Sequence, residues 1–276
     1  MKLSLAISSC PNDTFMFDAL INKKVDVKNY NFDIIISDVE ELNKLSQNAE
    51  TDISKMSFYN FFKVADRYQM LTSGAALGKN CGPLIISKRK IYPDELSDCH
   101  IAIPGESTTA NLLLQIFFPT ATNKHIYLFS DIEDVVLSDE CDAGLVIHET
   151  RFTYQKRGLK LAADLGVLWE EKFHLPIPLG GIAIKRSLPE YVKTDMNKIL
   201  RSSIEYAFSN PGSAMDFMKQ NAVELEEDVI QKHVDLYVNH FSIDMGKEGK
   251  DSIEKLYKVY SEISQLPYTK EDFLVG

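Results

Sequence analysis

The sequence predicts an α/β protein with two lobes and a ligand cleft between them. Short apolar stretches with the alternation of strands are each followed by a stretch with helical spacing, which is typical of α/β folds with largely parallel sheets. Residues 88–93 are basic and end in proline, and residues 176–181 hold two prolines and two glycines, so both segments interrupt this alternation. We therefore expect one lobe from residues 1–90 with 180–276 and another from residues 91–179.

The predicted elements follow in order along the chain. The first lobe begins with a strand at residues 3–8 and a helix from residue 15, which Asn12 or Asp13 can cap. Its other strands are predicted at 32–36, 52–56, 83–87 and 182–184, and its other helices at 39–47, 58–68, 189–208, 211–221, 226–241 and 252–266. The second lobe is predicted to hold strands at 100–103, 126–129 and 143–147 and helices at 110–118 and 131–137.

Composition and charge narrow the class of partner. The chain has 276 residues, 45% of them hydrophobic and 25% charged, which is ordinary for a globular protein that buries a sizeable core. Its net charge of -10 argues against nucleic acid or an anionic membrane as the main partner, because both need a positive surface. We expect a small-molecule partner. The net charge does not exclude a local basic pocket for an anionic metabolite.

The cysteines predict neither a metal site nor a disulfide framework. Cys10, Cys81, Cys99 and Cys141 show no Cys-x-x-Cys spacing and no histidine at metal-ligand spacing, so we expect free thiols in a reducing compartment. Only nine residues precede Cys10, too few for a lipoprotein signal, and the expected location is cytoplasmic. No dinucleotide or nucleoside-triphosphate motif occurs, so no cofactor is expected. Whether the protein forms a homodimer is left open.

Four polar turns mark a candidate ligand site. They lie at residues 8–14, 54–57, 105–109 and 148–151, each between a predicted strand and a predicted helix. A single turn of this kind is more often only a helix cap, but strand ends converge on the ligand crevice of an α/β sheet, so the four together predict a shared polar pocket. Lys55 beside Ser57 suits a carboxylate, whereas the alternative is a surface lysine at a sheet edge.

His148 is the candidate proton acceptor. It ends the apolar stretch 143–147 and begins a polar turn, and an imidazole can take up or release a proton at neutral pH. A structural role is the alternative for an isolated histidine in this setting. The other five histidines lack the setting, and His233 and His240 lie on a helical pattern.

Motifs spread over the chain resemble the 1,4-dihydroxy-6-naphthoate synthases of the futalosine route of menaquinone biosynthesis. These motifs are residues 9–15, 55–57, 73–78, 104–105 with 108–110, 144–154 and 179–181. The sequence departs from the family pattern at Ser9, where the family often has proline, and at Glu106 and Ser107. The departure at Ser9 removes no reacting group.

The resemblance implies a fold similar to type II periplasmic binding proteins. It also implies a lyase that converts cyclic de-hypoxanthine futalosine to 1,4-dihydroxy-6-naphthoate, with His148 as proton acceptor. The implied substrate-binding residues are Lys55, Met56 and Ser57 in one lobe and Thr109 and Ala110 in the other, and the neighbouring turns add Thr108, Asn12 and Asp13 as candidates. Formation of an aromatic ring helps to drive this elimination, so one base suffices without a metal. The alternatives are a non-catalytic solute-binding protein of the same fold and the sister enzyme chorismate dehydratase.

Overall fold

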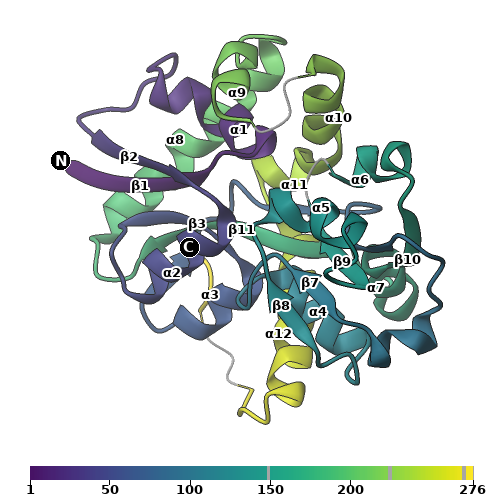
Figure 1. Cartoon of the computed structure of the whole chain (residues 1–276). Coiled ribbons are helices and arrows are strands. Elements are labelled where there is room, and N and C mark those ends of the chain that lie inside the picture. The colour runs from purple at the N-terminus through teal and green to yellow at the C-terminus, as the bar shows by residue number, and fades with distance from the viewer. Residues whose placement is uncertain (148–149, 223–225, 269–271, 276) are drawn as a thin grey trace.

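The computed structural model describes residues 1–147, 150–222, 226–268 and 272–275, and it contains two β-sheets covered by helices (Figure 1). The first sheet has the order β2-β1-β3-β11-β4, with β5 also paired to β11. Its strands are β1 (Lys2–Ser8), β2 (Asn31–Ser37), β3 (Ile53–Ser57), β4 (Tyr68–Met70), β5 (Ala76–Gly78) and β11 (Ile177–Lys185). The second sheet has the order β10-β6-β9-β7-β8, with β6 (Leu84–Ser87), β7 (Ile101–Ile103), β8 (Lys124–Ile126), β9 (Ala143–Val146) and β10 (Lys160–Asp164).

Both sheets are largely parallel in strand direction, as expected, but each also contains one strand that runs against all the others. In each sheet three neighbouring strands pair in parallel, β2-β1-β3 in the first and β8-β7-β9 in the second. β11 is antiparallel to β3, and β6 is antiparallel to β9. Both strands enter their sheet after the chain has crossed from the other one, so no helix crossover within the sheet makes them parallel.

The helices agree in the main with the expected pattern. They are α1 (Pro11–Ile21), α2 (Val39–Gln47), α3 (Phe58–Val64), α4 (Thr109–Phe117), α5 (Ile132–Leu137), α6 (Thr150–Thr153), α7 (Leu165–Phe173), α8 (Glu190–Ser209), α9 (Met215–Asn221), α10 (Glu227–Tyr237), α11 (His240–Ile243) and α12 (Gly246–Ile263). The helix expected at 58–68 is shorter because Tyr68 begins β4, and the one expected at 226–241 is divided into α10 and α11. None of the helices within the described ranges combines the length and hydrophobicity that crossing a membrane requires.

The start of α1 corrects a second expectation. Cys10 is the N-cap residue and Pro11 occupies the first turn, so neither Asn12 nor Asp13 caps the helix. Proline is common in the first turn of a helix, because it has no main-chain N–H that a cap would have to satisfy. The Asp13 carboxylate instead accepts hydrogen bonds from the main-chain N and the hydroxyl of Ser8, at the end of β1.

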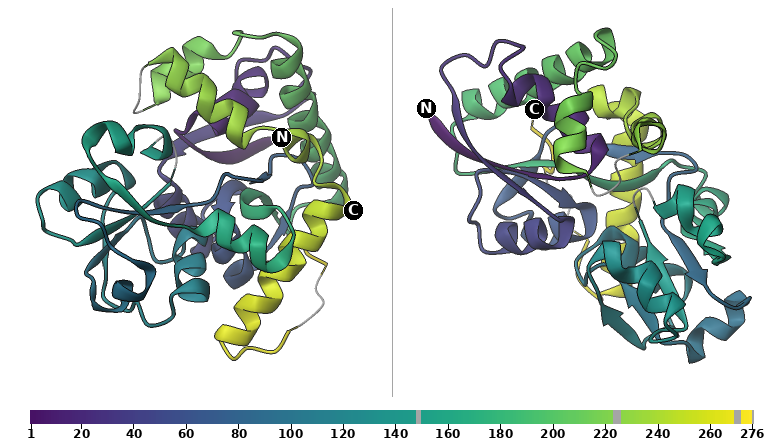
Figure 2. Two further views of the ribbon diagram at one scale, coloured as in Figure 1. Left: turned by 90° about the vertical axis from the view of Figure 1, so that its right-hand side faces the viewer. Right: turned by 45° about the horizontal axis from the view of Figure 1, so that its top comes forward.

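The two sheets belong to separate halves of the molecule. Figure 2 shows the second sheet and its helices as one body beside the part of the chain that carries both termini. β6 pairs with β9 and β10, so the first crossing lies between β5 and β6, before the lobe boundary expected at residue 90. α12 contacts α3 and β11 on one side and α4 on the other, and it thereby connects the halves.

β11 brings two glycines against neighbouring strands. A Cβ on Gly180 would lie 2.7 Å from the main-chain oxygen of Met56, and one on Gly181 would lie 2.6 Å from the sulfur of Met70. These glycines are therefore required by close packing inside the first sheet, at the strand that lines the site described below.

We predict that Gly180→Ala lowers the free energy of unfolding by about 1–3 kcal/mol, the usual cost of overpacking. The neighbour is main-chain oxygen, which cannot rotate away as a side chain could. Urea unfolding of the variant measures the change, and Ser187→Ala in the exposed turn after β11 is the matched control. An unchanged midpoint for Gly180→Ala would contradict the close approach of β11 to β3.

Candidate functional site

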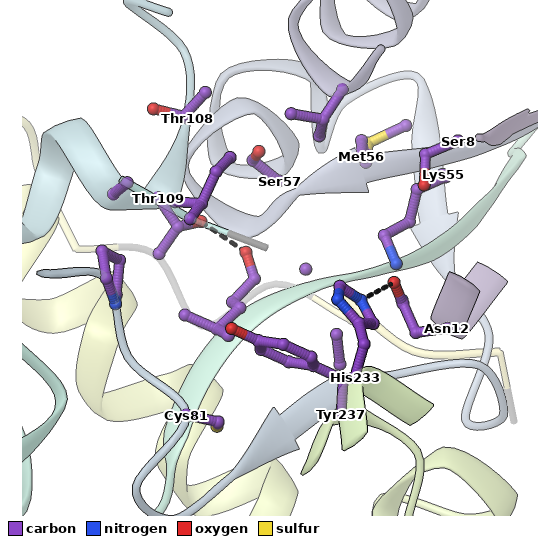
Figure 3. A pocket seen from close by; sticks show the side chains of 17 residues that line it. Ser8, Asn12, Lys55, Met56, Ser57, Cys81, Thr108, Thr109, His233 and Tyr237 are labelled. Atoms are coloured by element: carbon purple, nitrogen blue, oxygen red, sulfur yellow. Dashed lines mark hydrogen bonds between the residues drawn. The ribbon is translucent and has the colours of Figure 1, made fainter. Parts of the chain in front are cut away.

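A cavity of about 640 Å³, counted with its opening to solvent, is lined by strands of the first sheet and, from the other half of the molecule, by the start of α4. Its wall is mainly apolar, with polar side chains from Ser8, Asn12, Lys55, Ser57, Thr108, Thr109 and His233. Figure 3 shows Lys55, Asn12 and His233 on one side of the cavity and Thr108 and Thr109 on the other.

Strand ends and helix starts converge on this cavity, as the polar turns predict. Ser8 ends β1 and Ser57 ends β3, and both residues line the cavity. Asn12 stands in the first turn of α1, and Thr109 begins α4. Helix N-termini carry partial positive charge and unpaired N–H groups, so α1 and α4 favour an anionic ligand here.

Lys55 lies at the cavity wall, where Asp13 fixes its position. Its Nζ is 2.6 Å from Asp13 Oδ1, and the two side chains are only 7% and 0% exposed. Asp13 Oδ1 also accepts a hydrogen bond from Asn12 Nδ2 at 2.9 Å, and Oδ2 accepts from the Ser8 hydroxyl at 2.7 Å. Asp13 itself does not line the cavity. It therefore acts through Lys55 and Asn12, while the ammonium group of Lys55 keeps further N–H donors for a ligand.

Ser57 is oriented by Asn43 from α2. The main-chain N of Ser57 donates to Asn43 Oδ1 at 3.0 Å, and Asn43 Nδ2 donates to the Ser57 hydroxyl oxygen at 3.3 Å. Because this hydroxyl accepts from Asn43, its own proton is directed to another acceptor. Met56, on the same strand, is fully buried and adds apolar surface to the cavity.

Thr108 and Thr109 have different roles at the start of α4. Thr108 is the N-cap residue, and its hydroxyl accepts from Asn111 N at 3.2 Å. The Thr109 hydroxyl donates to the main-chain oxygen of Leu179 on β11 at 2.6 Å, and it therefore joins α4 to the first sheet. Both residues line the cavity together with Ala110.

The expected proton acceptor, His148, and its neighbour Glu149 lie outside the described residues. Ile147, the residue before His148, lines the cavity. The role of His148 thus stays a prediction.

The cavity also contains His233 and Tyr237, which were not among the expected site residues. Both lie on α10, and their ring centroids are 4.6 Å apart. His233 Nε2 lies 3.0 Å from Asn12 Oδ1, so α10 contacts the first turn of α1. The available sequence signal was a histidine in the buried stripe of an amphipathic helix, which more often indicates a satisfied core residue.

Cys81 lines the cavity but is unsuited to act as a nucleophile. Burial raises the pKa of its thiol to about 12, so the reactive thiolate is scarce at neutral pH. Within residues 1–147, 150–222, 226–268 and 272–275, no group of three or more His, Cys, Asp or Glu side chains is arranged to hold a metal ion.

We predict that the Asp13 and Lys55 substitutions are strongly coupled. Asp13→Asn should lower the free energy of unfolding by about 3–5 kcal/mol, because it leaves the buried ammonium without its counter-charge. The double variant Asp13→Asn with Lys55→Met should be more stable than the sum of the single effects, as denaturant unfolding of all four proteins would measure. Additive effects would mean that the ion pair does not hold the site together.

Comparison with known proteins places the chain in a family. The menaquinone biosynthesis family model matches residues 3–262. The chain is 38% identical to a 1,4-dihydroxy-6-naphthoate synthase of Thermus thermophilus, over 92% of each chain. It is 36% identical to the enzyme of the same name from Streptomyces coelicolor, over 92% of this chain and 91% of that one.

Solved structures agree on the fold. A crystal structure of a protein from Archaeoglobus fulgidus has a TM-score of 0.91 at 33% identity and covers 96% of this chain and 98% of its own. The periplasmic aliphatic sulphonate-binding protein of Escherichia coli has a TM-score of 0.66 at 11% identity, over 99% of this chain and 90% of its own, and this likeness concerns the fold alone. The chain belongs to the menaquinone biosynthesis family and has a two-lobed fold similar to that of periplasmic binding proteins.

Proposed function

We propose that this protein is a 1,4-dihydroxy-6-naphthoate synthase, a lyase that forms 1,4-dihydroxy-6-naphthoate from cyclic de-hypoxanthine futalosine. Family membership and two relatives of that name support the proposal. The observation that carries it in this chain is the cavity itself, where a buried lysine and the N-termini of α1 and α4 offer positive charge to one small anionic ligand.

In this proposal the substrate carboxylate is bound beside the Lys55 ammonium group, and Ser57 donates a hydrogen bond to a substrate oxygen. His148 removes a proton from carbon, and the departure of the sugar-derived fragment leaves an aromatic ring. Residues from both halves of the molecule hold the substrate in one orientation and exclude water from it. The reaction runs in the cytoplasm, which is supported by four buried cysteines that form no disulfide.

Purified protein tests the activity directly. Incubation with cyclic de-hypoxanthine futalosine should produce the absorbance of 1,4-dihydroxy-6-naphthoate, whereas incubation with chorismate should leave the chorismate unchanged. Loss of chorismate would indicate the sister dehydratase. Binding without turnover would indicate a solute-binding protein.

We predict that His148→Ala lowers kcat at least about 100-fold, the usual contribution of a general base, and changes substrate affinity little. Single-turnover kinetics separates the chemical step from binding. The control is His240→Ala, because His240 is exposed on α11 and does not line the cavity. Turnover of the His148 variant at the rate of the control would exclude His148 as the base.

We also predict that turnover needs no metal ion. Dialysis against a strong chelator should leave kcat unchanged, because the proposed elimination is completed by a base and the formation of an aromatic ring. The measurement compares chelated protein before and after addition of single divalent ions. Activity that is lost and then restored by one ion would refute this prediction.

A further inference from the structure

We propose that Asp13 and Asn12 keep a proton on Nε2 of His233, so that Nδ1 of the neutral ring accepts a hydrogen bond from a hydroxyl group of the substrate. The inference rests on the proposed function and deepens it. It assigns the recognition of the sugar-derived, hydroxyl-bearing part of the substrate to α10, which none of the expected site residues belongs to.

The first step is the protonation state of Asp13. Its side chain is 0% exposed, and four donor groups surround its two oxygens: Lys55 Nζ at 2.6 Å, Asn12 Nδ2 at 2.9 Å, the Ser8 hydroxyl at 2.7 Å and Ser8 N at 3.2 Å. A carboxyl group with donors on both oxygens and an ammonium ion in contact is a carboxylate. Asp13 therefore only accepts hydrogen bonds.

The second step is the orientation of the Asn12 amide. Because Asp13 only accepts, the Asn12 atom that faces it must be the NH₂ group, and Asn12 Oδ1 then points the other way. That oxygen lies 3.0 Å from His233 Nε2 (Figure 3). An amide oxygen is an acceptor only, so the proton of this hydrogen bond belongs to His233 Nε2. In the neutral imidazole ring Nδ1 is then the acceptor.

The third step concerns the hydrogen-bond acceptor that a substrate hydroxyl group requires in the cavity. Lys55, Ser57 and the N-termini of α1 and α4 all present donors, which suits a carboxylate. Substrate hydroxyl groups also have protons to donate, and a buried hydroxyl without an acceptor weakens binding. His233 lines the same cavity, and a neutral imidazole with a fixed tautomer supplies this acceptor. The rings of His233 and Tyr237 have centroids 4.6 Å apart and planes inclined by 44°, and this contact limits reorientation of the imidazole.

Ring-¹⁵N-histidine NMR of the whole protein tests the tautomer without any substrate. At a pH where His233 is neutral, its nitrogen shifts should be those of the Nε2–H form, with the signals assigned by their loss in His233→Gln. Asn12→Ala should convert these shifts to the average of a tautomer mixture. An Nδ1–H form in the unmodified protein would overturn the proposal.

Kinetics tests the substrate contact. Glutamine places its amide near the position of Nε2 and retains a donor for Asn12, but it has only carbon at the position of Nδ1. His233→Gln should therefore raise KM about 10-fold with kcat changed by less than about threefold, the scale expected for one neutral hydrogen bond. His233→Asn, which places an amide oxygen near the position of Nδ1, should recover part of this loss. His240→Asn is the matched control, because His240 is exposed at the start of α11.

The reaction product provides a second readout. It lacks the sugar-derived fragment, so its affinity, measured by calorimetry, should be the same for His233→Gln and the unmodified protein. Unchanged KM in an active His233→Gln variant, or equal losses of substrate and product affinity, would overturn the assignment of Nδ1 to the substrate hydroxyl. If the unmodified protein forms no naphthoate, the proposed function fails, whereas the tautomer is still decided by the NMR shifts.

Discussion

The buried carboxylate of Asp13 is the interaction on which the geometry of the site depends. A carboxylate at 0% exposure is tolerated only if its charge and lone pairs are satisfied, and here Ser8 from β1, Asn12 from α1 and Lys55 from β3 satisfy them. These three elements must therefore meet at one point. That requirement brings the ends of two strands and the start of a helix to the same wall of the cavity, and it gives the ammonium group of Lys55 a fixed place there.

The sequence predicts those site residues whose position depends on neighbouring residues in the chain, and it misses those placed by contacts between distant segments. Lys55, Ser57, Thr108 and Thr109 were predicted as site residues because strand ends and helix starts carry short-range signals, and all four line the cavity. Asp13 was also predicted, because it lies in the polar turn at residues 8–14, but it does not line the cavity and its carboxylate accepts hydrogen bonds from Ser8 and Asn12. His233 could not be predicted in the same way, because its contact with Asn12 joins residues 221 positions apart.

The fold shows the same division between local and tertiary information. The long helix α8 and alternating strands such as β1 and β2 were predicted closely, since apolar periodicity specifies them, whereas α12 begins at Gly246, six residues before its expected start. Three-residue strands such as β4 and β5 are too short to show a period, and they exist because β11 offers them hydrogen-bond partners. The antiparallel direction of β6 and β11 is likewise set by the crossings between the sheets, about which local patterns say nothing.

Hydrogen bonds across the cavity rim limit how the cavity opens to a substrate. Glu40 on α2 accepts from Ser107 N at 3.1 Å, and Thr109 on α4 donates to the Leu179 oxygen at 2.6 Å. Gly105 allows the first contact, because a Cβ there would lie 2.3 Å from Glu40 Cδ.

The Glu40 carboxyl is costly to keep ionised in this position. Burial raises its pKa, because the charged form loses its hydration, whereas hydrogen bonds from Asn43 and Ser107 lower the pKa and oppose this shift. Opening the rim would break contacts worth about 1–3 kcal/mol each but would return this carboxylate to water, which offsets part of the loss. The same buried glutamate therefore favours closure through its hydrogen bond and lowers the cost of opening through its hydration.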